Sequence, residues 1–227
     1  MSNASNPLAI NYKNLGVAKH KKGKYKDACE DYLRSIEIEP NDSETHYFMG
    51  LSLSALEKYN EAIDRFNNAI KIDGGKNTIY YFNLALTKFK SKDLEGAQEN
   101  YSKFIENDLK LSESNHLYLR AFFERGNIRR MKDDKIGAIL DWSYVIEHIK
   151  RFDANEKDIH LYNQASDKLA KERISDLKTH EELSKLSTID KLNLFENPDI
   201  YKEWMESDYM PEVLKKGFKR NGQRFKN

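Results

Sequence analysis

The sequence predicts an all-α fold, a solenoid of four helix-turn-helix pairs followed by a capping helix and short helices. Three columns of residues recur along the chain with the same steps of 34, 35 and 41 residues, which indicates a stacked-repeat architecture. Only four prolines and ten glycines occur in 227 residues, which favours helix throughout. Charged residues make up 33% of the chain, as the large outer surface of a solenoid requires. The columns are Gly16, Gly50, Ala85 and Gly126; Ala28, Ala62, Ala97 and Ala138; and Tyr32, Phe66, Tyr101 and Trp142.

The first helix pair is expected in residues 9–42, after an N-terminal tail of residues 1–8. Its helical periodicity is interrupted at Gly23, where the chain turns between the two helices. The second helix should end before Pro40, because proline cannot continue the backbone hydrogen-bond ladder. Asp42, with its neighbours, can cap the next helix by accepting hydrogen bonds from free backbone N–H groups.

Three further pairs are expected in residues 43–76, 78–111 and 119–152. Glycines 74 and 75 close the second pair in place of a proline. The third step of the columns is seven residues longer than the first (41 against 34), so an insertion near Leu111 precedes the fourth pair. An insertion there is tolerated because it lies outside the packed core.

The small columns indicate close approaches between helices. We expect each glycine of the first column to face the alanine of its own pair, for example Gly16 against Ala28, because a large side chain there would hold the backbones apart. The aromatic column, such as Tyr32, is then expected to fill the space between one pair and the next.

The last third of the chain does not follow the columns. Residues 153–186 carry an apolar stripe at helical spacing and are expected to form a helix that caps the end of the array. Residues 187–227 form a C-terminal extension too apolar for a free tail. Three interpretations of this extension stay open: it extends the cap, it folds back into a groove of the array as an internal ligand, or it docks on a neighbouring molecule.

The repeat pattern resembles that of the tetratricopeptide repeat family over residues 9–152. In the first pair the resemblance depends on Tyr12-x-x-Leu15-Gly16 and, after the turn, on Gly23-x-Tyr25-x-x-Ala28-x-x-x-Tyr32 and Pro40. The second pair repeats it with His46-x-x-Met49-Gly50, Tyr59-x-x-Ala62-x-x-x-Phe66 and Ala69. The later pairs match more loosely.

The resemblance implies a right-handed superhelix whose concave face is lined by the first helix of each pair. An apolar channel with asparagines and basic ends suits an extended or helical peptide, since asparagine can both donate to and accept from a peptide backbone. The peptide-binding residues expected on that face are Lys13, Asn14, Tyr47, Phe48, Leu51, Phe82, Asn83, Leu86, Phe89, Phe123, Asn127 and Arg130.

Some members of the family grip the terminal carboxylate of a chaperone tail with lysine, asparagine and arginine side chains. Lys13 stands where one clamp lysine would be. Phe48 stands where a clamp asparagine would be, as does Val17, and Asn83 stands where the clamp arginine would be. These departures argue against binding of a chaperone tail.

No motif in the chain indicates catalysis, a cofactor or a metal. A glycine-rich phosphate loop and a nucleophile elbow are both missing, and the six histidines show no metal-ligand spacing. Cys29 is the only cysteine, which excludes an internal disulfide, and its place on a packed helix predicts a buried structural thiol. We therefore expect a protein that is not an enzyme and has no cofactor.

The sequence thus predicts a noncatalytic protein-protein interaction scaffold that binds a peptide segment of a partner in its groove. The alternative is a self-association module in which residues 187–227 occupy the groove or a neighbouring molecule. A formal net charge of +1 gives no field that favours nucleic acid. The N-terminus has no secretory signal and no apolar run spans a membrane, so we expect a cytoplasmic protein unless a signal has been removed.

Overall fold

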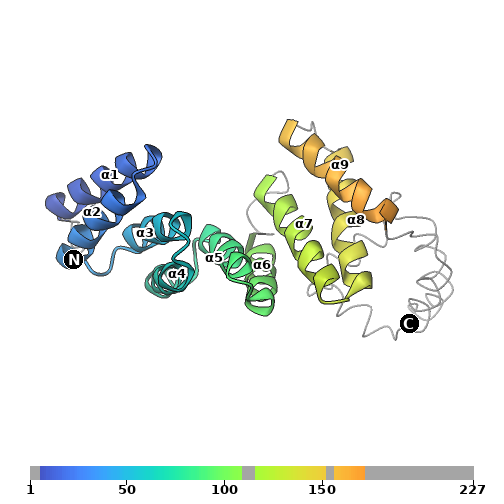
Figure 1. The fold of residues 1–227 in the computed structure, drawn as a ribbon, viewed down its shortest axis with the longest axis horizontal. Helices are drawn as coiled ribbons and strands as arrows, with labels where there is room; N and C mark the ends of the chain where they lie inside the picture. Colours follow the sequence, from blue (N-terminus) through green and yellow to red (C-terminus); the bar gives the residue numbers. More distant parts are fainter. Residues whose placement is uncertain (1–5, 109–115, 152–155, 172–227) are drawn as a thin grey trace, which may run out of the picture. The chain divides into compact units, whose positions relative to one another are not determined.

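A computed structural model describes residues 6–108, 116–151 and 156–171. These residues form nine α-helices and no strand (Figure 1). The chain divides into two compact units, Met1–Phe104 and Ile105–Asn227, and each is described by itself. The helices are α1 (Pro7–Lys21), α2 (Tyr25–Ile38), α3 (Ser43–Ala55), α4 (Tyr59–Asp73), α5 (Ile79–Lys90), α6 (Leu94–Asp108), α7 (His116–Met131), α8 (Lys135–Arg151) and α9 (Glu156–Lys171).

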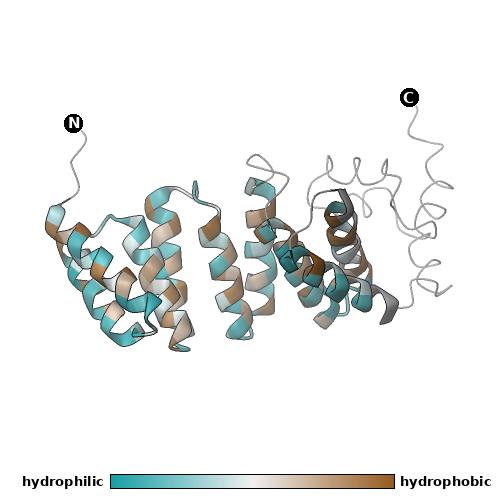
Figure 2. Cartoon of the chain, turned by 90° about the horizontal axis from the view of Figure 1, so that it is seen from above, coloured by the Kyte–Doolittle hydropathy of each residue, from teal (hydrophilic) through white to brown (hydrophobic). Residues whose placement is uncertain are grey.

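The first unit is a stack of helix pairs. α1 packs against α2 and α3 against α4, while α2 also packs on α3 and α4 on α5, so each pair rests on the next. The turns within pairs lie along one edge of this unit and the loops between pairs along the other (Figure 2). The predicted all-α fold of repeated helix pairs is therefore confirmed.

The ends of the helices follow from local chemistry. α2 ends at Ile38, two residues before Pro40, as predicted. Asp42 caps α3 by accepting a hydrogen bond from the backbone N–H of Glu44 at 3.1 Å. Asp93 caps α6 in the same way, accepting from the N–H of Gly96 at 2.9 Å. Such caps each contribute about 1 kcal/mol to stability.

The turn inside each pair places one residue in the left-handed region of backbone space. The φ angles are 74° at Gly23, 60° at Glu57, 68° at Lys92 and 65° at Asp133. These four positions are separated by the same steps as the three sequence columns, so they form a fourth column. Only the first has glycine, the residue that adopts this conformation without strain.

The glycines of the first column face aromatic rings, which corrects the expected pairing with alanine. A methyl group added at Gly16 would lie 2.5 Å from the ring of Tyr32, and one at Gly50 would lie 2.8 Å from the ring of Phe66. Each ring belongs to the second helix of the same pair. Part of the aromatic column therefore fills the crossing inside a pair, although Tyr32 also stacks on Phe48 of the next pair, with the ring centroids 6.3 Å apart.

The second unit contains the pair α7–α8 and the helix α9. A buried ionic network joins the pair, because Arg125 donates two hydrogen bonds to Asp141, at 2.8 and 3.0 Å, and Arg129 donates one at 3.1 Å. α9 packs on α8 and touches α7, just as α3 packs on α2 and touches α1. α9 thus takes the place of the first helix of a further pair. The remainder of the predicted capping helix and all of residues 187–227 lie outside the described residues.

Candidate functional site

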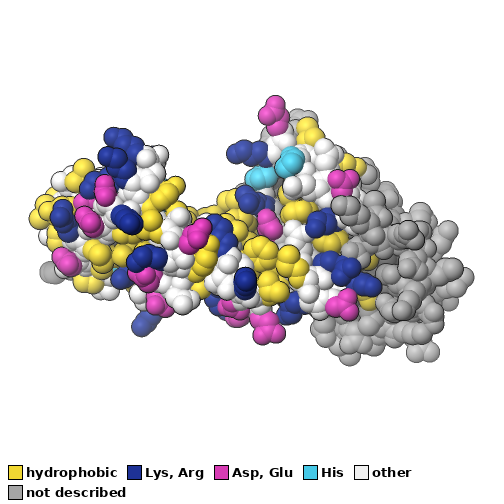
Figure 3. Space-filling view, in the orientation of Figure 1, with side chains coloured by type: hydrophobic (Ala, Val, Ile, Leu, Met, Phe, Trp, Pro, Cys, Tyr) yellow, Lys and Arg dark blue, Asp and Glu magenta, His cyan; other side chains and the backbone are white. Residues whose placement is uncertain are grey.

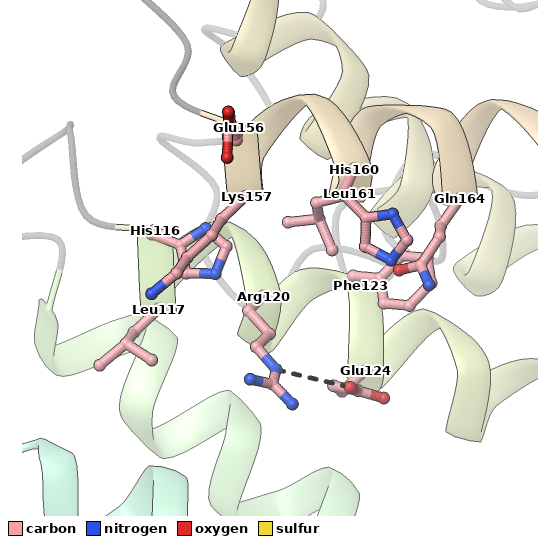
Figure 4. A pocket seen from close by; sticks show the side chains of 10 residues that line it. All are labelled: His116, Leu117, Arg120, Phe123, Glu124, Glu156, Lys157, His160, Leu161 and Gln164. Carbon is pink, nitrogen blue, oxygen red and sulfur yellow. Dashed lines mark ion pairs between the residues drawn. The ribbon is translucent and has the colours of Figure 1, made fainter.

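An open cleft of about 690 Å³ lies between α7 and α9 in the second unit (Figure 4). The cleft exists because α9 packs mainly on α8 and only touches α7, which leaves space between two successive first-helix positions. Each helix contributes residues at spacings of three or four, so a single face of each lines the cleft. The lining residues are His116, Leu117, Arg120, Phe123 and Glu124 from α7, and Glu156, Lys157, His160, Leu161 and Gln164 from α9.

The floor of the cleft is apolar and rigid. Phe123 and Leu161 are 7% and 5% exposed, so both belong to the core as well as to the cleft. Leu117 is half-buried beside them. A floor of core side chains holds its shape before a ligand arrives, which lowers the entropy that binding must overcome.

The rim of the cleft is polar and carries both signs of charge. Arg120 and Glu124 extend from α7, and their closest charged atoms, Nε and Oε1, are 3.7 Å apart (Figure 4). Lys157, His160 and Gln164 extend from α9 and are exposed. Histidine side chains are visible at the surface where α7 and α9 adjoin (Figure 3). These groups can donate to and accept from a bound peptide.

One contact ties the two walls of the cleft together. His116 Nδ1 on α7 lies 2.7 Å from Asp158 Oδ1 on α9, and both side chains are partly buried. This hydrogen bond lies at the N-terminal ends of both helices. It restricts how far the cleft can open at that end.

In the first unit, the predicted binding residue Lys13 holds two helix pairs together. Its Nζ lies 3.0 Å from Asp42 and 2.9 Å from Glu44, at the start of α3. Burial lowers the pKa of Lys13, but the hydrogen bonds to Glu44 and Asp42 outweigh this, and the pKa is raised. The ammonium group is thus already paired within the molecule.

Tyr47 and Asn83, both predicted to bind peptide, also bridge neighbouring pairs. The Asn83 amide donates to the Tyr47 hydroxyl at 3.1 Å and to the Ile79 carbonyl at 3.0 Å. The ring of Tyr47 lies 4.7 Å from that of Tyr80, and burial raises the pKa of Tyr47 to about 12. Phe48 is half-buried and packs against the core of this unit. These side chains connect the pairs whether or not they also contact a ligand.

Phe82 lies in the core rather than on an open surface. It is 3% exposed and packs edge-on against Tyr101 and Phe104 of α6. Among the other predicted residues of this unit, Asn14 is exposed, and Leu51, Leu86 and Phe89 are half-buried. These four keep accessible area on the first helices.

The three predicted residues on α7 are in different environments. Phe123 lines the cleft, as described above. Asn127 donates to Glu124 at 3.4 Å, and its buried Oδ1 has no hydrogen-bond partner. Arg130 is half-buried and lies 3.8 Å from Asp133.

The contribution of α9 to the cleft was not predicted from the sequence. Leu161 and Ala165 on α9 repeat the spacing of Phe122 and Gly126 on α7, with a step of 39 residues. Both are buried, with Ala165 fully so. This fifth occurrence of the small column was the signal that could have identified α9 as a first helix.

The other chemical expectations concern cysteine, metals and membranes. Cys29 is buried, and burial raises its pKa to about 11, so the thiolate that would act as a nucleophile is disfavoured. Within the described ranges, no group of three or more histidine, cysteine or acidic side chains is arranged to hold a metal ion. In that same part of the chain, no helix has the length and apolar character needed to cross a membrane.

Solved structures with similar folds are tetratricopeptide repeat (TPR) domains and related proteins. The first TPR of Spaghetti (RPAP3), bound to the HSP90 peptide SRMEEVD, is 20% identical over 59% of this chain and 99% of its own, with a TM-score of 0.52. The Sgt2 TPR domain from Aspergillus fumigatus is 22% identical over 59% and 84%, with a TM-score of 0.51. PcrH, in complex with the chaperone binding region of PopD, is 18% identical over 57% and 97%, with a TM-score of 0.53. At these identities the likeness shows the fold alone.

Sequence comparison with curated proteins found no match. The family model described as tetratricopeptide repeat matches three successive segments, residues 11–42, 43–75 and 79–110. These coincide with α1–α2, α3–α4 and α5–α6. Residues 11–110 of this chain therefore match the tetratricopeptide repeat model three times in succession, and the rest of the chain is not matched by the family model.

Proposed function

We propose that this protein is a noncatalytic scaffold that binds a peptide segment of a partner protein in the cleft between α7 and α9. The observation that carries the proposal is the cleft itself, with an apolar floor and a polar rim. Its volume of about 690 Å³ lies within the range of roughly 300–1,000 Å³ typical of ligand pockets.

The chemistry of the cleft suits a peptide. An apolar side chain of the peptide can cover Phe123 and Leu161, which supplies the desolvated contact that dominates such interfaces. The Gln164 amide can donate to and accept from the peptide backbone. Arg120 and Lys157 can pair with acidic side chains of the peptide.

The proteins with similar folds support this proposal. One of them holds an HSP90 peptide and another is in complex with the chaperone binding region of PopD, and both share the repeated helix-pair fold. We propose the first helices of the first unit as a second contact surface for a partner. The accessible residues of that surface are Asn14, Leu51, Leu86 and Phe89.

A random peptide library displayed on phage tests the function of the cleft. Peptides selected on the wild-type protein should lose binding at least tenfold to the double variant Arg120→Glu, Gln164→Arg, because both exposed side chains lie on the rim. Lys135→Glu is the matched control, since this exposed residue at the start of α8 does not line the cleft. If no peptide is enriched, or if every enriched peptide binds both proteins equally, the cleft is not a peptide site.

A further inference from the structure

We propose that the cleft between α7 and α9 binds residues 194–212 of the same chain, so that an external peptide must compete with an internal one. This inference rests on the proposed function, since it assigns an occupant to the same cleft.

The composition of residues 194–212 is that of a ligand for an apolar cleft with cationic groups on its rim. The segment has six acidic residues against a single lysine, Lys202. Apolar and aromatic residues alternate with the acidic ones, and aromatic anchors are the side chains that contribute most to binding energy. The apolar and aromatic residues are Leu194, Phe195, Ile200, Tyr201, Trp204, Met205, Tyr209 and Met210.

The cleft has complementary groups. Its floor of Phe123, Leu161 and Leu117 can receive an aromatic anchor. Arg120 and Lys157 are cationic, and two histidines add donors, whereas the two glutamates of the lining are Glu124, which faces Arg120, and Glu156, the first residue of α9. Arg120 and Lys157 can each pair with an acidic residue of the segment, an interaction that a peptide without acidic side chains would not offer.

The linker after α9 is long enough for residues 194–212 to fold back onto the cleft. Leu194 follows Lys171, the last residue of α9, by 23 residues. If the predicted capping helix continues to Leu186, that residue lies about 39 Å along the helix from His160. The 18 residues from Leu186 to Trp204 span up to roughly 59 Å when extended, which is enough to bring Trp204 back to the cleft. The cleft lies along α9, and a helix of 16 residues is about 24 Å long. An attached segment within reach has an effective concentration in the millimolar range, so even weak affinity would keep the cleft occupied.

Competition with a labelled peptide of residues 194–212 tests the pairing in the full-length chain. The double variant Tyr201→Ser, Trp204→Ser should bind this probe about tenfold more tightly than the wild type, because its own segment no longer fills the cleft. The matched control is Phe218→Ser, Phe225→Ser, which removes two aromatic rings outside the segment and should bind the probe as the wild type does. Adding Arg120→Glu and Lys157→Glu to the first variant should abolish probe binding, because both cations of the rim are then replaced by groups that repel the acidic probe.

Two results would overturn the proposal directly. Equal affinity of the wild type and the Tyr201→Ser, Trp204→Ser variant for the probe would show that residues 194–212 do not compete for the cleft. Probe binding that survives the Arg120→Glu and Lys157→Glu substitutions would place the segment elsewhere. Circular dichroism of each variant, with unchanged helix content, confirms that the comparison is between folded proteins.

A third measurement separates this occupant from a second copy of the chain. Light scattering across a hundredfold range of protein concentration should show a monomer for both the wild type and the Tyr201→Ser, Trp204→Ser variant. A dimer that forms only in the wild type would mean that the segment occupies a neighbouring molecule, which overturns the intramolecular proposal. If library peptides require the cleft but the probe does not bind, the proposed function stands and this inference fails.

Discussion

At the scale of single residues, the glycines of the array have two different physical roles. Gly16 lies at a helix crossing, where the ring of Tyr32 occupies the space that a side chain would need. Gly23 lies in a turn with φ at 74° and open space around it, so only its backbone conformation is demanding. The same residue type is therefore required by packing at one site and by conformation at the other.

Replacing Gly16 with alanine should destabilise the protein by about 1–3 kcal/mol, because the new methyl group would overlap the Tyr32 ring. Urea denaturation followed by circular dichroism measures the change. The double variant Gly16→Ala, Tyr32→Leu should recover part of the loss. A single variant with unchanged stability would contradict the packing role.

Replacing Gly23 with alanine should cost about 1 kcal/mol, because an alanine in the left-handed region is strained while no neighbour is touched. The reverse change, Lys92→Gly in the equivalent turn, should not destabilise, since it relieves the same strain. Thermal unfolding of both variants checks the pair. A larger loss for Lys92→Gly than for Gly23→Ala would refute this account of the turn column.

His46 should make the protein less stable in mild acid. Its Nε2 donates to the Pro40 carbonyl at 3.0 Å, so the neutral ring leaves Nδ1 unprotonated, and Nδ1 is buried without a partner. Burial lowers the pKa of His46 below the ordinary value of about 6.5. The unfolded chain then binds a proton more readily than the folded one, and stability falls as the pH drops below about 6.5.

The variant His46→Gln keeps a hydrogen-bond donor and removes the titration. The loss of free energy of unfolding between pH 7 and pH 5 should therefore be smaller in this variant than in the wild type. Burial also lowers the pKa of His20, so part of the pH dependence should remain. An unchanged pH dependence in His46→Gln would assign the effect to other groups.

At the scale of elements, the pair α7–α8 has a buried ionic network at its centre, and the pair α1–α2 has a more exposed counterpart in which Lys19 lies 2.6 Å from the buried Asp31. Asp141 is fully buried and receives hydrogen bonds from two arginines, Arg125 and Arg129, which are themselves buried. Removing the negative charge would leave two buried cations without their main partner. This network fixes how the two helices of the pair face each other.

The variant Asp141→Asn should therefore be destabilised by about 3–5 kcal/mol, the usual cost of breaking a buried ion pair. Asp133→Asn is the control, because this carboxylate is exposed and lies 3.8 Å from Arg130, and surface pairs contribute about 0–1 kcal/mol. Urea denaturation monitored by helix content compares the two. Similar losses for both variants would show that burial of the network does not determine its strength.

At the scale of the whole molecule, the repeat array and the cleft are formed by different parts of the chain. Residues 11–110 form repeats whose motif residues build the core, and such residues carry little information about a partner. The cleft depends on α9, which continues the packing pattern of the repeats but is not matched by the family model. The cleft therefore lies outside the matched repeats.

Enlarging Ala165 tests whether the position of α9 is needed for binding. This fully buried residue does not line the cleft, and Ala165→Leu should overpack the contact beneath α9 and displace the helix. Library peptides that bind the wild type should bind this variant at least tenfold more weakly, while circular dichroism shows most of the helix content retained. Wild-type affinity in the Ala165→Leu variant would show that peptide binding does not depend on how α9 packs.

The sequence by itself determined the helix pairs, their turns and their caps. These features depend on residues close together in the chain, such as Asp42 at the start of α3 and Gly23 in the first turn, and their spacing is visible as a period. The stacking of pairs also followed, because three columns with one set of steps leave few other arrangements. The physical reason is that hydrogen bonds within helices and turns, and the apolar faces of helices, depend on residues that are close together in the chain.

Only the tertiary structure decided which side chains remain available for binding. Phe82 and Leu86 lie on one helix, and both were predicted to line the groove. The ring of Phe82 is enclosed by Tyr101 and Phe104 of α6, whereas the side chain of Leu86 is only half-buried. The charge of Lys13 is paired with Asp42 and Glu44, which follow it by about thirty residues. The cleft between α7 and α9 likewise brings together side chains about forty residues apart. Exposure and charge pairing depend on neighbours distant in the sequence, which a single helical pattern does not specify.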